Sequence, residues 1–165
     1  MHVLVETNGV ALDRQGLEVL KEGGVEAFWL DIKAFDPAIH RRLTGFDNAN
    51  VLAAPALMRE LGFTFEVLSL LIPGVVEEEE LVRIAELVAA VDPEVPFTLL
   101  AFFPAHEMSD RRAPTHSEMM RAGEAVLRAG VKNLRLGNLG VFCTSASEVS
   151  QALSLGAPSR GRSAI

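Results

Sequence analysis

Polar side chains follow the first two apolar segments of the chain, where the strands of a parallel sheet would end. Glu6, Thr7 and Asn8 end the first segment, and Asp31 and Lys33 end the second. The carboxyl ends of parallel strands meet at one edge, where active sites of α/β proteins collect. Alternation places Asp31 and Lys33 on one face, so they could bind the ammonium and the carboxylate of a zwitterionic ligand. The alternatives are an ordinary strand-to-helix turn and a structural ion pair.

Histidine and glycine supply the remaining candidates. His106 lies just beyond the fourth apolar segment, at the same predicted edge. Its imidazole could change protonation near neutral pH or stack on a base, although a surface-loop histidine is an equal alternative. We expect the other histidines, His2, His40 and His116, on helix and loop surfaces. The segment 137–140 favours a tight turn over a phosphate-binding loop.

Composition restricts the class of protein. The 165 residues are enough for one domain with a substantial core, and 49% of them are hydrophobic. A net charge of −7 argues against nucleic-acid binding. No apolar run reaches the ~18 residues of a membrane span, and no signal peptide is recognisable, so we predict a cytoplasmic protein without membrane contact. The acidic run 77–80 is expected to be a solvated first helical turn.

Cysteine usage is minimal. Cys143 is the one cysteine in the sequence. It cannot form a disulfide within the chain, and one thiolate cannot hold a zinc ion or an iron–sulfur cluster. We therefore expect Cys143 to act as a small apolar side chain.

Strand-like and helix-like segments alternate along the chain. The expected strands are 2–6, 27–32, 64–72, 97–103 and 133–136, and the expected helices are 13–21, 37–43, 48–61, 77–91, 115–129 and 145–155. The longer strands are apolar with little alternation, which indicates a parallel sheet buried on both faces. A complete eight-stranded barrel takes ~250 residues. We predict an α/β fold that is either an open sheet or, as we prefer, a partial (β/α) barrel over residues 1–142, with a terminal helix and flexible tail over 143–165.

Five motifs occur in an order that resembles a known family. They are Glu6-Thr7-Asn8-Gly9, Trp29-Leu30-Asp31-Ile32-Lys33, Ile39-His40-Arg41-Arg42-Leu43-Thr44-Gly45, Leu71-Ile72-Pro73-Gly74 and Phe103-Pro104-Ala105-His106. Together they resemble the C-terminal half of the radical S-adenosylmethionine (SAM) superfamily, and especially pyruvate formate-lyase activating enzymes. The resemblance covers about residues 2–142.

The resemblance implies a partial barrel in which a 4Fe–4S cluster chelates SAM and generates a radical that abstracts hydrogen from a protein or small substrate. Glu6 and Asp31 would lie near the amino-acid end of SAM, around a monovalent cation with Thr7, and Asn8 would be a further cofactor-binding residue. Lys33 would contact the carboxylate or ribose, and His106 the adenosine. Glu6 stands where the family has Asp, and 68–69 (Leu-Ser) where it has an Arg.

The 165 residues lack two other motifs of this family, the Cys-x3-Cys-x2-Cys cluster loop and the Gly-Gly-Glu-Pro segment. Cys143, beyond the fifth strand, cannot replace three thiolates. The sequence therefore predicts the C-terminal portion of a radical SAM enzyme, as a fragment, through a misassigned start, or as a natural remnant. Alone, such a chain should neither bind a cluster nor form a radical.

Two alternative functions remain. The first strand would leave an open sheet edge, which suits a non-catalytic interaction module that pairs with a second copy or with a missing N-terminal half. Asp31, Lys33 and His106 could instead serve a self-contained lyase or isomerase that forms a Schiff base on Lys33. The neighbouring carboxylate of Asp31 favours the charged ammonium, which argues against that chemistry.

Overall fold

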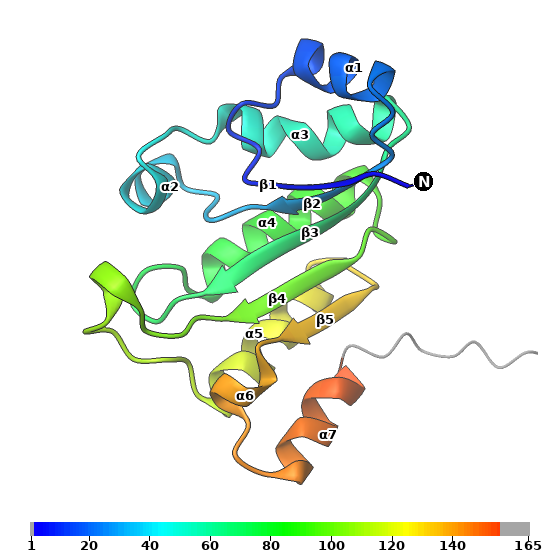
Figure 1. Ribbon diagram of the computed structural model, residues 1–165. Helices are drawn as coiled ribbons and strands as arrows, with labels where there is room; N and C mark the ends of the chain where they lie inside the picture. Colours follow the sequence, from blue (N-terminus) through cyan, green and yellow to red (C-terminus); the bar gives the residue numbers. More distant parts are fainter. Residues whose placement is uncertain (1, 156–165) are drawn as a thin grey trace, which may run out of the picture.

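Five parallel strands form the centre of the molecule. The computed structural model describes residues 2–155, and its sheet has the order β1-β2-β3-β4-β5 (Figure 1). The strands are β1 (Leu4–Thr7), β2 (Ala27–Asp31), β3 (Thr64–Leu71), β4 (Phe97–Ala101) and β5 (Leu134–Gly137). The prediction of an α/β fold with five parallel strands is confirmed. The tail expected beyond residue 155 lies outside the described residues.

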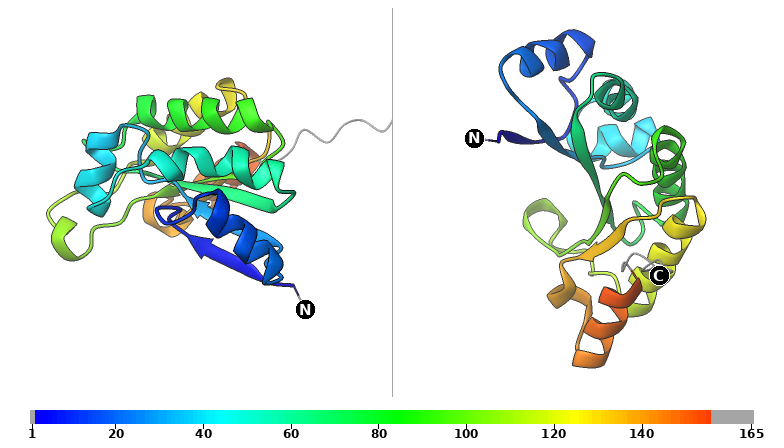
Figure 2. Two further views of the ribbon diagram at one scale, coloured as in Figure 1. Left: turned by 90° about the horizontal axis from the view of Figure 1, so that it is seen from above. Right: turned by 90° about the vertical axis from the view of Figure 1, so that its right-hand side faces the viewer.

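Helices connect each strand to the next, and two more follow the last strand. Those between strands are α1 (Arg14–Glu22), α2 (Pro37–Thr44), α3 (Ala49–Glu60), α4 (Glu78–Val91), the 3-10 turn η1 (His106–Met108) and α5 (His116–Arg128); α6 (Leu139–Phe142) and α7 (Ala146–Leu155) follow β5. Figure 2 shows a crescent, with α3, α4 and α5 along the outer side of the curved sheet. This is the shape of a partial barrel. The short helix α6 occupies the segment where a tight turn was expected.

The sheet has one face in the core and one face open, so the expectation that it would be buried on both faces was wrong. Phe28 and Leu30 of β2 are fully buried beneath the helices, whereas Trp29 between them is 41% exposed. Because paired residues of parallel strands point to the same side, the ladder register extends this assignment across the sheet. We call the open side the inner face; it carries Leu4, Glu6, Trp29, Asp31, Glu66, Leu68, Thr98, Leu100 and Arg135.

A capping box starts helix α5. The Thr115 hydroxyl accepts the Glu118 amide at 3.3 Å, and the Glu118 carboxylate accepts the Thr115 amide at 2.8 Å. Both carboxylate oxygens of Glu118 also accept hydrogen bonds from the Arg112 guanidinium at 2.7 Å. The Arg112 guanidinium, followed by the Thr115 amide, lowers the pKa of Glu118 to about 2.

Because of Glu118, the unfolding free energy of the protein should decrease at acidic pH. Because its pKa is lower in the folded state than the ordinary 4.5, its contribution is complete above that value and is lost as the pH falls toward about 2. The variant Glu118→Gln should lose about 1–2 kcal/mol of unfolding free energy at neutral pH, since its carboxylate is partly solvated. Its stability should also vary less between neutral and acidic pH. Urea unfolding at both pH values measures this. Glu124→Gln, in the exposed pair with Arg128, is the control; equal losses in both variants would contradict the prediction.

Candidate functional site

An ion pair stands at the carboxyl end of β2. The Lys33 Nζ lies 2.5 Å from the Asp31 Oδ2, and the two side chains are 32% and 22% exposed. The other carboxylate oxygen, Asp31 Oδ1, is buried and has no hydrogen-bond partner among residues 2–155. A buried acceptor without a donor costs free energy. The pair therefore presents a charge-compensated carboxylate with one oxygen still available to a donor.

Glu6 and Thr7, at the end of β1, point to opposite faces of the sheet. Glu6 pairs in register with Trp29, so it shares the inner face with Asp31, and it is exposed. Thr7 pairs with the buried Leu30 and faces the helices; its hydroxyl accepts the Gly9 amide at 3.0 Å. Of the three side chains predicted to surround a monovalent cation, two share a face and the third points to the opposite one.

Asn8 and Gly9 are required by the local geometry of the turn after β1. The Asn8 Oδ1 accepts the Val10 amide at 3.2 Å, so this side chain stabilises the turn itself. Gly9 has φ +75°, and a Cβ there would lie 2.8 Å from the Leu30 Cδ1. Only glycine suits both the left-handed backbone and the close approach to β2.

His106 lies on the loop that follows β4, on the exposed turn η1, with φ 47°. Among the described residues, no hydrogen bond or ion pair joins it to Asp31 or Lys33. His106 therefore lies past the carboxyl end of β4, at the predicted edge of the sheet, but it does not contact the Asp31–Lys33 pair.

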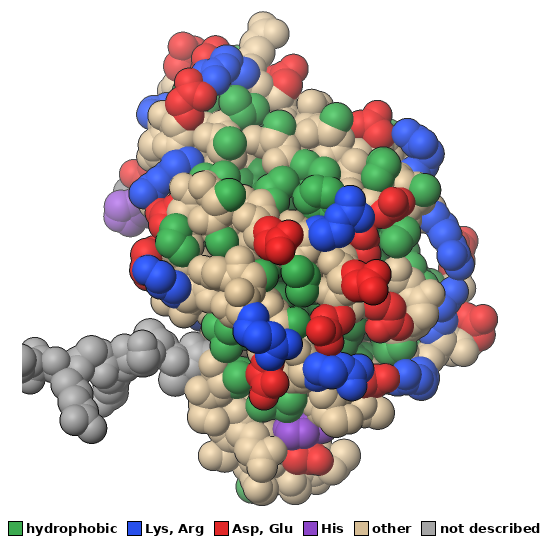
Figure 3. Space-filling model, turned by 180° about the vertical axis from the view of Figure 1, so that it is seen from behind, with side chains coloured by type: hydrophobic (Ala, Val, Ile, Leu, Met, Phe, Trp, Pro, Cys, Tyr) green, Lys and Arg blue, Asp and Glu red, His purple; other side chains and the backbone are tan. Residues whose placement is uncertain are grey.

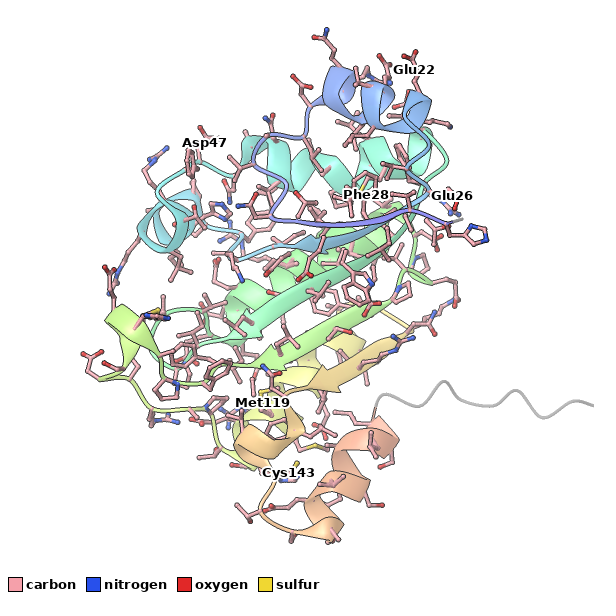
Figure 4. The ribbon with its side chains drawn as sticks, in the orientation of Figure 1. Glu22, Glu26, Phe28, Asp47, Met119 and Cys143 are labelled. Atoms are coloured by element: carbon pink, nitrogen blue, oxygen red, sulfur yellow. The ribbon has the colours of Figure 1, made fainter. Side chains whose placement is uncertain are left out.

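His40 was expected on a helix surface, and this was wrong: the residue is fully buried. It lies on α2, just after the loop that follows β2, and neither ring nitrogen has a hydrogen-bond partner among residues 2–155. Burial lowers the pKa of His40, and the nearby backbone of Ala34, followed by the carboxylates of Asp47 and Asp31, opposes this shift. Asp47 lies on the connection between α2 and α3 (Figure 4). The buried imidazole therefore lies within electrostatic reach of Asp31 and Lys33.

The acidic run 77–80 was expected to be solvated, but its last residue, Glu80, is buried. Glu80 is 8% exposed, and its carboxylate accepts the amides of Phe35 and Asp36, both at 2.8 Å. These amides belong to the segment 32–36 after β2, which we call the β2–α2 loop. A signal for this was present: Glu80 stands four residues before Ile84, on the apolar face of α4.

Two more polar side chains missed in the sequence hold the same loop. Asn48 stands at the start of α3 but makes no capping bond; its amide donates to the carbonyls of Ala34 at 3.1 Å and Phe35 at 2.8 Å. The fully buried Ser69 of β3 donates to the Ile32 carbonyl at 2.9 Å. The loop that carries Lys33 is therefore anchored from α3, β3 and α4.

Metal ligands and thiols are sparse in the part of the chain that the structure describes. Residues 2–155 contain no cluster of three His, Cys, Asp or Glu side chains that could hold a metal ion. Cys143 follows α6, near α7, at the opposite edge of the sheet from β1 (Figure 4). Burial raises the pKa of its thiol.

The outer surface is electrostatically mixed. Acidic and basic side chains alternate over the helices without a one-sided basic patch on the face that Figure 3 shows. Within residues 2–155, none of the helices has the length and apolarity needed to cross a bilayer.

Comparison with known proteins identifies the family. Residues 1–88, more than half of the chain, match the model of the radical SAM superfamily. A protein of Methanocaldococcus jannaschii, named as a glycyl-radical enzyme activating enzyme, is 24% identical over 131 residues. The match covers 77% of this chain and 49% of that protein, so the chain spans about half the length of this curated relative.

Solved structures agree on the fold. A domain of pyruvate-formate lyase-activating enzyme from Bacteroides vulgatus superposes with a TM-score of 0.69 at 20% identity, covering 84% of this chain and 82% of that one. Bacillus subtilis HMG-CoA lyase gives 0.61 at 16% identity, covering 94% of this chain and 50% of that one. The family match, the parallel sheet and the polar groups at its carboxyl end lead to one conclusion: this chain belongs to the radical SAM superfamily.

Proposed function

We propose that this chain forms part of the SAM-binding site of a radical SAM enzyme of the activating-enzyme type. The observation that carries the proposal is the Asp31–Lys33 pair at the carboxyl end of β2. The family uses SAM and a 4Fe–4S cluster in general. SAM ends in a zwitterionic amino acid, and the buried, unpartnered Asp31 Oδ1 suits its ammonium group.

The roles of the other residues follow from their positions. Lys33 keeps a positive charge on the inner face for the SAM carboxylate or ribose, while its bond to Asp31 fixes its direction. Glu6 adds a second carboxylate on the same face. His106, on the η1 turn, would reach the adenosine only from farther along the rim. Asp31 and Lys33 therefore bind and orient, and Glu6 and His106 extend the site.

The residues of this chain do not fit the cluster. A 4Fe–4S cluster with one open iron needs three thiolates, and the 165 residues contain one cysteine. Thiolates from outside these residues must hold it, and the chain by itself is inactive in radical formation.

The cysteine count gives a direct prediction. After anaerobic reconstitution with iron and sulfide, followed by desalting, the 165-residue chain should retain no 4Fe–4S absorbance or stoichiometric iron. A bacterial ferredoxin treated in parallel is the positive control. Retention of four irons per chain would contradict this part of the account.

Equilibrium dialysis with radiolabelled SAM tests the proposed function. The chain should bind SAM, and Asp31→Asn should weaken binding because it removes the charge opposite the SAM ammonium. Asp110→Asn, on an exposed loop residue, is the control. The proposal would be refuted if the wild-type chain showed no measurable SAM affinity, or if Asp31→Asn bound SAM as tightly as the wild type.

A second candidate function rests on the sheet edge. β1 is an outer strand, and the inner face beside it carries Leu4, 48% exposed, and Trp29, 41% exposed. Such an edge favours pairing with a further strand, from a second copy or from another polypeptide. A dimer at micromolar concentration by light scattering would support self-pairing, and a strict monomer would contradict it.

A further inference from the structure

We propose that Glu80 is a positioning residue for the Asp31–Lys33 pair and acts through the β2–α2 loop. The identification of SAM as the ligand of this pair rests on the proposed function. The action of Glu80 on the loop rests on contacts between α4 and the segment 32–36 alone.

Glu80 binds two consecutive backbone amides with one oxygen. Its Oε2 accepts the amides of Phe35 and Asp36, each at 2.8 Å. The side chain of Glu80 is 10% exposed, so both bonds are shielded from water. Hydrogen bonds from amides to a carboxylate are about twice as strong as those between neutral groups. Glu80 therefore fixes the loop two residues beyond Lys33.

Arg83 completes this contact. Its Nη1 lies 3.1 Å from the other carboxylate oxygen of Glu80, and its guanidinium stands 4.1 Å from the centre of the Phe35 ring. Arg83 therefore compensates the charge of Glu80 and covers the side chain of the residue that Glu80 binds. The buried carboxylate is paired, as its low exposure requires.

The remaining anchors enclose Lys33 on both sides. Ser69 binds the carbonyl of Ile32, before Lys33, and Asn48 binds the carbonyl of Ala34, after it. With Glu80, these side chains leave the backbone around Lys33 little freedom to rotate. From this restrained backbone the Lys33 side chain extends to Asp31, where its ammonium bonds the Oδ2 and leaves the Oδ1 without a partner among residues 2–155.

Three variants separate positioning from simple stabilisation. Glu80→Ala removes both amide contacts; Glu80→Gln keeps one carbonyl oxygen as an acceptor; Glu79→Ala removes an exposed charge from the same helical turn. The first readout is hydrogen exchange at the amides of Phe35 and Asp36, followed by NMR. The second is the rate at which an amine-specific reagent labels Lys33, followed by mass spectrometry. The third is the SAM dissociation constant.

Glu80→Ala should raise exchange at Phe35 and Asp36 about tenfold or more, raise the labelling rate of Lys33, and weaken SAM binding about tenfold. Glu80→Gln should recover part of each effect, and Glu79→Ala should match the wild type. Urea unfolding corrects exchange for any global loss of stability. Should Glu80→Ala fail to fold, increased exchange of Glu80→Gln confined to Phe35 and Asp36 supports the proposal, and unchanged exchange there overturns it.

The readouts distinguish this proposal from the proposed function. If the wild-type chain does not bind SAM, the SAM site fails, while exchange and Lys33 labelling still decide the role of Glu80. Exchange and labelling in Glu80→Ala that equal those of Glu79→Ala would overturn the positioning role even if SAM binds. Normal SAM affinity in a Glu80→Ala chain with a loosened loop would overturn it as well.

Discussion

Replacing Lys33 by methionine is expected to weaken SAM binding by the chain about tenfold to a hundredfold, since charge-assisted contacts are strong in a partly enclosed site. The ammonium is the positive charge nearest to Asp31, 2.5 Å from its Oδ2. Without it, the SAM carboxylate loses its partner, and the Asp31 carboxylate loses the charge that compensates it. Methionine keeps the length and apolar character of the lysine stem. Equilibrium dialysis measures the affinity.

Lys132→Met is the matched control for this variant. Lys132 pairs with Glu94 at 2.9 Å, but both side chains are about 60% exposed, at the amino end of β5 and far along the sheet from β2. It should bind SAM as the wild type does. Equal affinities for Lys33→Met and the wild type would show that the ion pair is structural only.

Replacing Phe28 by alanine is expected to lower the unfolding free energy by about 3–5 kcal/mol. Phe28 is fully buried, and its ring meets that of Phe63 edge-on with centroids 5.0 Å apart. In Figure 4 Phe28 lies on β2, in the midst of the surrounding core. The substitution leaves a cavity beneath the strand that ends in Asp31. Urea denaturation measures the loss.

Phe46→Ala is the control, because Phe46 is 58% exposed on the connection after α2. Its loss should stay within about 0.5 kcal/mol, as for most surface substitutions. A Phe28→Ala chain as stable as Phe46→Ala would mean that β2 is not packed as described.

Much of the fold was predictable because its signals are local. The apolar run 64–72 indicated a strand within a parallel sheet, and β3 indeed has parallel neighbours on both sides, although only one of its faces is buried. Asp36-Pro37 indicated a helix start, where the Asp36 carboxylate accepts the amides of Ala38 and Ile39. The two-residue spacing of Asp31 and Lys33 placed both side chains together and left a ligand-binding pair and a structural ion pair open; in the structure β2 ends at Asp31, and Lys33 bonds to it from the β2–α2 loop.

The missed features depend on contacts between distant parts of the chain. Glu80 binds amides 44 and 45 residues away. The sequence of an acidic first helical turn does not indicate which of its carboxylates will bind a distant loop. His40 is fully buried on α2, although its neighbours 41 and 42 are exposed arginines, so the sequence around it indicated a surface position. The direction of Thr7 depended on the exact end of β1, since a one-residue shift reverses the face of each side chain.

A titration of the ¹⁵N-labelled 165-residue chain with SAM, followed by amide NMR shifts, is the sharpest test of the proposed SAM site. Saturable shifts are expected at Asp31, Lys33 and the rest of the β2–α2 loop, with helix α7 unchanged. An absence of shifts at millimolar SAM, or shifts confined to regions away from the carboxyl end of β2, would contradict it.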